Sequence, residues 1–105
     1  MSRQYITVAR VGELKPDTMK RILVDGRRLL LVHANGRYHA VDEMCSHEES
    51  SLYLGCVQDG RIKCSLHGSR FDLTSGEALD EPADAPIGVH AVRIDGDEIQ
   101  VALCD

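Results

Sequence analysis

Four Asx-Gly pairs divide this sequence into short apolar stretches, and they constrain the fold more than any other feature. They are Asp25-Gly26, Asn35-Gly36, Asp59-Gly60 and Asp95-Gly96. Such pairs favour the positive φ angles of tight hairpin turns. The stretches between them predict strands at about residues 5–9, 19–24, 28–34, 37–41, 61–63, 69–72, 89–94 and 98–103. No window shows a helical period, so we expect an all-β fold, a small antiparallel sandwich or barrel.

Size and charge exclude several classes of protein. A chain of 105 residues is the size of one domain, so we expect a single domain over residues 1–105. The formal net charge of -5 argues against partners made of nucleic acid or anionic membrane. The longest aliphatic run, Leu29–Val32, cannot span a bilayer, and Met1–Tyr5 has no apolar signal region. We therefore expect a cytoplasmic protein, in which four cysteines indicate metal binding or reduced thiols rather than disulfides.

Two polar, turn-rich stretches, residues 42–58 and 73–88, interrupt the strand pattern and are expected to be loops. Long loops in a small domain commonly carry function. Charge is also uneven, with 11 basic and 9 acidic residues in 1–75 but one basic residue, Arg93, and 8 acidic residues in 76–105. This acidic segment either steers a basic partner or keeps the surface hydrated.

Two cysteine–histidine pairs are the candidate metal ligands. Cys45 and His47 are separated by one residue, Cys64 and His67 by two, and sixteen residues lie between His47 and Cys64. The Asp59-Gly60 turn lies between the pairs and would fold the chain back so that they meet. Two thiolates and two imidazoles suit tetrahedral zinc, although common zinc spacings differ. They also suit a [2Fe–2S] cluster with both cysteines on one iron and both histidines on the other.

The pattern C-x-H, sixteen residues, then C-x-x-H-G resembles the Rieske iron–sulfur family. Cys64–Asp72 is similar to the family's second cluster loop as it runs into a strand, and Pro82–Pro86 to the third loop that covers the cluster. The resemblance implies one [2Fe–2S] cluster with four ligands: Cys45, Cys64, His47 and His67. The cysteines would hold the inner iron and the histidines the outer iron. It also places five further residues around the cluster: Leu66, Gly68, Ser69, Phe71 and Pro82.

The resemblance also implies how the domain is organised. A cluster-binding subdomain of loops and short strands, about residues 43–86, is expected within a basal β part, about residues 1–42 and 87–105. Within the family, high-potential members carry a disulfide and a tyrosine that hold negative charge on the cluster. Ser50, Leu66 and Phe71 stand at those positions here, so we expect a low potential, which a donor at Ser69 would raise slightly.

A short Rieske protein without a membrane anchor resembles the ferredoxins of bacterial aromatic-ring dioxygenase systems. That resemblance implies a monomeric one-electron carrier between an NAD(P)H-dependent flavoprotein reductase and a terminal non-heme iron oxygenase. We expect no active site of its own, because no G-x-G-x-x-G loop is present and His33, His39 and His90 show no ligand spacing with an acid. Cys56 and Cys104 are expected to be packing residues or unliganded thiols.

Two alternatives remain at this point. The chain could be the Rieske-like small subunit of a reductase, such as an assimilatory nitrite reductase. It could also be a zinc-stabilised binding module without a redox role. Retention of both Cys-His pairs favours a working electron carrier over the first alternative.

Overall fold

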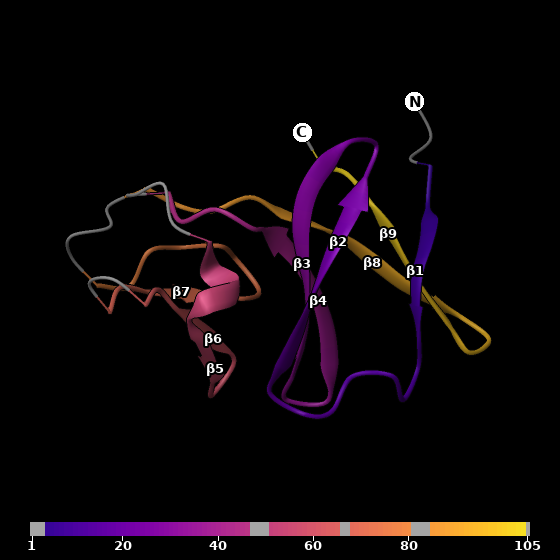
Figure 1. Cartoon of the computed structure of the whole chain (residues 1–105), viewed down its shortest axis with the longest axis horizontal. Coiled ribbons are helices and arrows are strands. Elements are labelled where there is room, and N and C mark those ends of the chain that lie inside the picture. The colour runs from indigo at the N-terminus through magenta and orange to yellow at the C-terminus, as the bar shows by residue number, and fades with distance from the viewer. Residues whose placement is uncertain (1–3, 47–50, 66–67, 81–84, 105) are drawn as a thin grey trace.

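The computed structural model describes residues 4–46, 51–65, 68–80 and 85–104, which form two antiparallel sheets (Figure 1). The larger sheet has the order β1-β9-β8-β4-β3-β2 and the smaller the order β5-β6-β7. The strands are β1 (Ile6–Arg10), β2 (Thr18–Val24), β3 (Arg27–Ala34), β4 (Arg37–Asp42), β5 (Cys56–Gln58), β6 (Arg61–Lys63), β7 (Arg70–Asp72), β8 (Val89–Asp95) and β9 (Glu98–Ala102). The predicted all-β fold is confirmed, and one 3-10 turn, η1 (Leu52–Leu54), precedes the smaller sheet.

The Asx-Gly pairs make the predicted hairpins. At Asp25-Gly26, Asn35-Gly36 and Asp59-Gly60 both residues have positive φ, and each pair is the two-residue loop between successive strands. The fourth pair differs, because Asp95 ends β8 and only Gly96 has a positive φ, of 64°. Glycine at the first position of that loop is the pattern of a II′ turn, which twists the strands in the same sense as a I′ turn.

β3 is buried on both of its faces and organises two cores. Leu29 and Leu31 pack with Ile99 and Val101 inside the curved six-stranded sheet. The alternate residues of β3, Leu30 and Val32, face a second core that lies between the two sheets. A strand that is covered on both faces has a continuously apolar sequence, and β3 accordingly contains the longest aliphatic run of the chain.

The two edges of the larger sheet, β1 and β2, are bridged by a side chain. The Lys20 ammonium on β2 donates to the Val8 carbonyl at 3.2 Å and lies 2.6 Å from the Glu13 carboxylate. The hydrogen bond from Lys20 is the main cause that lowers the pKa of Glu13. The sheet is therefore a nearly closed barrel whose open seam carries a cation, which discourages pairing with another strand.

The prediction of an unbroken loop over residues 42–58 is wrong at its end. β5 occupies Cys56–Gln58 and pairs with β6, with Val57 opposite Ile62 on the buried face. The Asp59-Gly60 turn was the signal for this strand, because a hairpin turn needs a strand on each side. No helix among the described residues is long and apolar enough to cross a membrane.

Both the backbone conformation and the surroundings of residue 76 require glycine there. Its φ is +78°, and a Cβ there would lie 2.2 Å from the Ile87 carbonyl oxygen. Gly26 has nearly the same φ, +79°, but nothing lies within 4 Å of its Cβ position. The left-handed conformation costs a non-glycine residue about 1–2 kcal/mol, and only Gly76 adds a steric clash.

We therefore predict that Gly26→Ala lowers the melting temperature by roughly 4–8 °C, and that Gly76→Ala lowers it by more than twice as much. Thermal unfolding followed by circular dichroism compares the two variants. Equal shifts would show that the contact between Gly76 and Ile87 carries no energy.

His39 on β4 gives the fold a pH dependence. Burial lowers its pKa below the ordinary value of 6.5 and Arg37 acts in the same direction, against the weaker effect of Asp72. The unfolded chain therefore takes up a proton more readily than the folded chain as pH falls through 6.5. The stability contributed by the neutral ring is present above that pH and is lost below it.

We predict that the wild-type protein loses more stability than His39→Gln between about pH 7.5 and about pH 5.5. Melting temperatures of the two proteins at both pH values provide the measurement, and any contribution of other groups cancels in the difference. Parallel pH profiles would contradict this role of His39.

Candidate metal centre

Cys45 and Cys64, the two predicted cysteine ligands, lie in the core between the sheets. Cys45 follows β4 and Cys64 follows β6, and their side chains are only 6 % and 2 % exposed. Both belong to the same buried cluster as Leu30, Phe71 and Ile87. Cys45 and Cys64 are nineteen positions apart in the sequence, but the fold brings both into one apolar region.

Glu43 closes the base of the first cysteine loop. Its buried carboxylate accepts a hydrogen bond from Ser51 Oγ at 2.7 Å, and its carbonyl accepts one from the Leu52 amide at 2.7 Å. A β-bridge joins Met44 to Ser51 one step further along the loop. These contacts fix the two ends of the segment that contains Cys45.

The second cysteine loop is closed by its backbone. The Cys64 amide donates to the Ser69 carbonyl at 2.8 Å, and the Gly68 amide donates to the Cys64 carbonyl at 3.1 Å. Gly68 has a φ of +73°, and a Cβ there would lie 3.3 Å from Cε of Lys63. Ser69 and Phe71 follow and are buried, with exposures of 1 % and 0 %. Glycine is thus required at Gly68 by the tight turn.

A third segment is tied to the first cysteine loop. Ser46 directly follows Cys45 in the sequence, and its Oγ donates to the Ala85 carbonyl at 2.5 Å. The returning chain then reaches β8 through Gly88, whose amide donates to Asp42 Oδ2 at 3.0 Å. Three segments that are distant in the sequence therefore meet beside Cys45, and Figure 1 shows them together at the end of the molecule away from the β8–β9 turn.

The structure does not describe His47, Leu66, His67 and Pro82, so four of the predicted positions lie outside the described residues. No disulfide joins the four cysteines, all of which are described. Among the described residues alone, no group of three or more His, Cys, Asp or Glu side chains could hold a metal ion.

The other histidines have structural partners. His33 Nδ1 lies 2.9 Å from the Leu14 carbonyl, and its ring stacks on Tyr38. His90 accepts a hydrogen bond at Nδ1 from the Cys104 amide, so its Nε2–H donates to Asp42 at 2.8 Å. This arrangement requires the neutral Nε2-protonated ring.

The remaining two cysteines are less buried than Cys45 and Cys64. Cys56 is exposed on β5 and Cys104 is half-buried after β9, and neither belongs to the core cluster of Cys45 and Cys64.

Three contributors to this region were not predicted from the sequence: Glu43, Ser46 and Asp42. Glu43 and Asp42 read as ordinary loop acids, and Ser46 as a spacer between two ligands. Each acts through a partner that is distant in the sequence: 8 residues for Glu43, 39 for Ser46 and 46 for Asp42 with Gly88. A local sequence pattern carries no signal for such pairs.

Comparison with known proteins agrees with this geometry. The Rieske [2Fe-2S] domain family matches residues 4–95. The ferredoxin component of the naphthalene 1,2-dioxygenase system of Pseudomonas aeruginosa is 28% identical over 103 residues, covering 98% of this chain and 99% of that protein. The solved ferredoxin of carbazole 1,9a-dioxygenase from Nocardioides aromaticivorans IC177 is 32% identical, with a TM-score of 0.90 and coverage of 95% and 98%. A solved complex of reduced oxygenase and oxidized ferredoxin in carbazole 1,9a-dioxygenase contains a chain that is 25% identical, with a TM-score of 0.89 and coverage of 96% and 94%.

A small antiparallel barrel with a second three-stranded sheet and two cysteines buried in one core fits an iron–sulfur domain. The chain belongs to the Rieske [2Fe–2S] domain family, and its cofactor is one Rieske-type cluster. The zinc-stabilised module considered from the sequence is therefore rejected.

The Ser46 contact makes a prediction about cluster retention. Ser46→Ala removes the hydrogen bond to Ala85, which is worth about 0.5–1.5 kcal/mol, and should speed loss of the cluster absorbance in the presence of a chelator by roughly threefold to tenfold. Ser65→Ala is the matched control, because Ser65 also follows a cysteine but is exposed and makes no hydrogen bond to the described residues. Equal rates of loss for both variants would contradict a stabilising role for the contact between Ser46 and Ala85.

Proposed function

We propose that this chain is a Rieske ferredoxin that relays single electrons to the terminal oxygenase of a ring-hydroxylating dioxygenase system. The observation that carries the proposal is the burial of Cys45 and Cys64 in one core, at the bases of two loops, in a chain of the Rieske family. Full-length similarity to ferredoxin components of naphthalene and carbazole dioxygenase systems supports the assignment. We expect no separate active site.

The proposed ligands are Cys45 and Cys64 for the inner iron and His47 and His67 for the outer iron. The buried thiols fit the inner position, because a thiolate in an apolar core is stable only when a cation such as iron compensates its charge. When bound, the cluster accepts and returns one electron. Residues 43–86 would form the cluster-binding subdomain and the remainder the basal part that supports it.

The chain's own residues restrict where electrons can leave. Phe71, Ile62 and Leu52 are fully buried in the same core cluster as the cysteines. Ser46 and Ala85 join the first loop to the returning chain. Electrons would enter and leave at this end of the molecule, with His47 and His67 as the proposed ligands of the outer iron.

The proposed potential is low for a Rieske centre. Two neutral imidazoles replace two thiolates, so the centre carries less negative charge and accepts an electron more easily than a plant-type cluster. Phe71 offers no hydroxyl to hold negative charge on a cysteine ligand, and it is fully buried. We place the potential at the lower part of the range of roughly -150 to +300 mV that Rieske centres span.

Two further components complete the proposal. An NAD(P)H-dependent flavoprotein reductase would supply the electrons, and a non-heme iron oxygenase would accept them. The solved complex of an oxygenase with a ferredoxin supports the second partner by similarity. A monomer in the cytoplasm suits a carrier that must contact each of these proteins in turn.

Voltammetry tests the proposal. We predict a reversible one-electron wave near or below about 0 mV at neutral pH, which falls further at alkaline pH as the imidazole ligands lose protons. His47→Cys should lower the potential towards the value of roughly -400 mV of plant-type clusters. His33→Gln is the matched control and should leave the potential unchanged, because His33 is bound to Leu14 and Tyr38 in the basal sheet.

An unchanged potential in His47→Cys would overturn the ligand assignment. A wild-type wave several hundred millivolts more positive would instead indicate quinol-type chemistry. Stable co-purification with a large siroheme subunit would contradict the dioxygenase assignment and favour a nitrite reductase subunit.

A further inference from the structure

A strip of apolar and cationic side chains runs beside both cysteine loops, and we call it the η1 face. It is formed by Arg21, Leu23, Arg28, Tyr53, Leu54 and Lys63. The first three belong to β2 and β3, the next two to η1, and the last to β6. Among the described residues, Leu54 and Leu23 are the two most exposed large hydrophobic side chains, at 71% and 67%.

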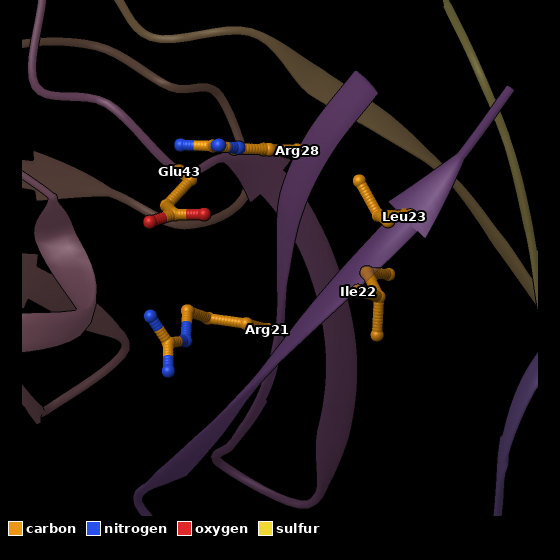
Figure 2. A pocket seen from close by; sticks show the side chains of 5 residues that line it. All are labelled: Arg21, Ile22, Leu23, Arg28 and Glu43. Atoms are coloured by element: carbon orange, nitrogen blue, oxygen red, sulfur yellow. The ribbon is translucent and has the colours of Figure 1, made fainter. Parts of the chain in front are cut away.

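One hollow of the η1 face lies between the larger sheet and η1. Its volume is about 480 Å³, and Arg21, Leu23, Arg28 and Glu43 are among the residues that line it. Figure 2 shows the two guanidinium groups reaching from β2 and β3 towards the smaller sheet, with the Glu43 carboxylate between them in this view. Glu43 is only 6% exposed and is bound by Ser51, so the two arginines dominate the charge that this hollow presents to a partner.

η1 contacts Arg21 of this hollow and itself lines a second hollow. The Arg21 guanidinium lies 4.8 Å from the centre of the Tyr53 ring, which joins β2 to η1 by a cation–π contact. The second hollow, of about 420 Å³, is lined by Leu54, Lys63 and Cys64 together with Gly55, Cys56, Ser65 and Gly68. No acidic residue is among them. Because Cys64 lines it, the η1 face is continuous with the proposed cluster site.

The charge of this face is opposite to that of the whole chain. The net charge is -5, yet the described residues of the η1 face are cationic around two apolar side chains. Three described acidic residues, Asp95, Asp97 and Glu98, lie together on the β8–β9 hairpin, at the opposite end of the molecule in Figure 1. Glu48 and Glu49 lie outside the described residues.

We propose that the η1 face docks an acidic redox protein, whose carboxylates contact Arg21, Arg28 and Lys63 and whose apolar patch covers Tyr53 and Leu54. The proposal rests on the function proposed above and specifies the chemistry of the partner. One electron would pass from the reduced cluster to the oxidised metal centre of that partner, and no bond is made or broken. Apolar contact provides affinity at such a face, and the cations orient the partner and speed its approach.

Two small redox proteins of opposite charge serve as probes, acidic plastocyanin and basic cytochrome c. Each is titrated at low ionic strength into the oxidised, isotope-labelled chain, and amide chemical shifts report where it binds and its Kd. We expect plastocyanin to shift amides of β2 and β3 and of any observable residue of η1. Cytochrome c should shift the β8–β9 hairpin, which carries Asp95, Asp97 and Glu98.

Variants then assign the contacts. The double variant Arg21→Gln, Arg28→Gln should weaken plastocyanin binding roughly fivefold and leave the Kd of cytochrome c unchanged. Leu54→Ser should weaken plastocyanin binding at high ionic strength as well as low, because an apolar contact is not screened by salt. Arg10→Gln is the control, since Arg10 is paired with Asp97 at the opposite end of the molecule and should leave plastocyanin binding intact.

The outcomes separate this proposal from the function on which it rests. Binding of plastocyanin at the β8–β9 hairpin, no binding at all, or an unchanged Kd in the double variant would each overturn the η1 face as the docking surface. The absorbance and midpoint potential of the same samples test the electron-carrier function independently. If the protein shows a reversible Rieske signal but the variants bind plastocyanin with an unchanged Kd, the electron-carrier function stands and the docking surface is rejected.

Discussion

Burial of β3 on both faces is the constraint on which the rest of the structure depends. One face of the strand completes the interior of the barrel through Leu29 and Leu31, and the other supports the core that contains Cys45 and Cys64. A single strand of a 105-residue chain thus serves two cores. The barrel can be stable while the loops above it carry irregular backbone, because the second core is anchored on a strand that the barrel already holds in place.

Much of this architecture could be predicted from local sequence, because hairpins are local. The Asx-Gly pairs located the tight hairpins of both sheets, and the Cys-His spacing by itself indicated a metal site. β5 was missed because its three residues end the polar, turn-rich stretch 42–58 and were assigned to that loop. The pairing of β1 with β9, at opposite ends of the chain, also has no local signal.

The candidate site shows the same division between local and distant information. The spacing predicts the cysteines as ligands, and the structure buries both in one core, but the residues that hold their loops were not predicted. Glu43 with Ser51, and Ser46 with Ala85, are pairs of common residues that acquire a role only when the chain has folded. In the sequence, these loop-closing residues could not be distinguished from ordinary polar residues that contact solvent.

The position of η1 links this architecture to electron transfer. Ser51 caps the start of η1, and its hydroxyl donates to Glu43 and accepts a hydrogen bond from the Tyr53 amide. The same short turn therefore closes the first cysteine loop and presents Tyr53 and Leu54 to solvent. Electron transfer falls steeply with distance, so a docking surface is useful only where it adjoins the cluster. Ser51, which closes the loop, and the exposed residues Tyr53 and Leu54 follow one another closely in the chain. The proposed docking surface therefore lies next to the proposed metal site.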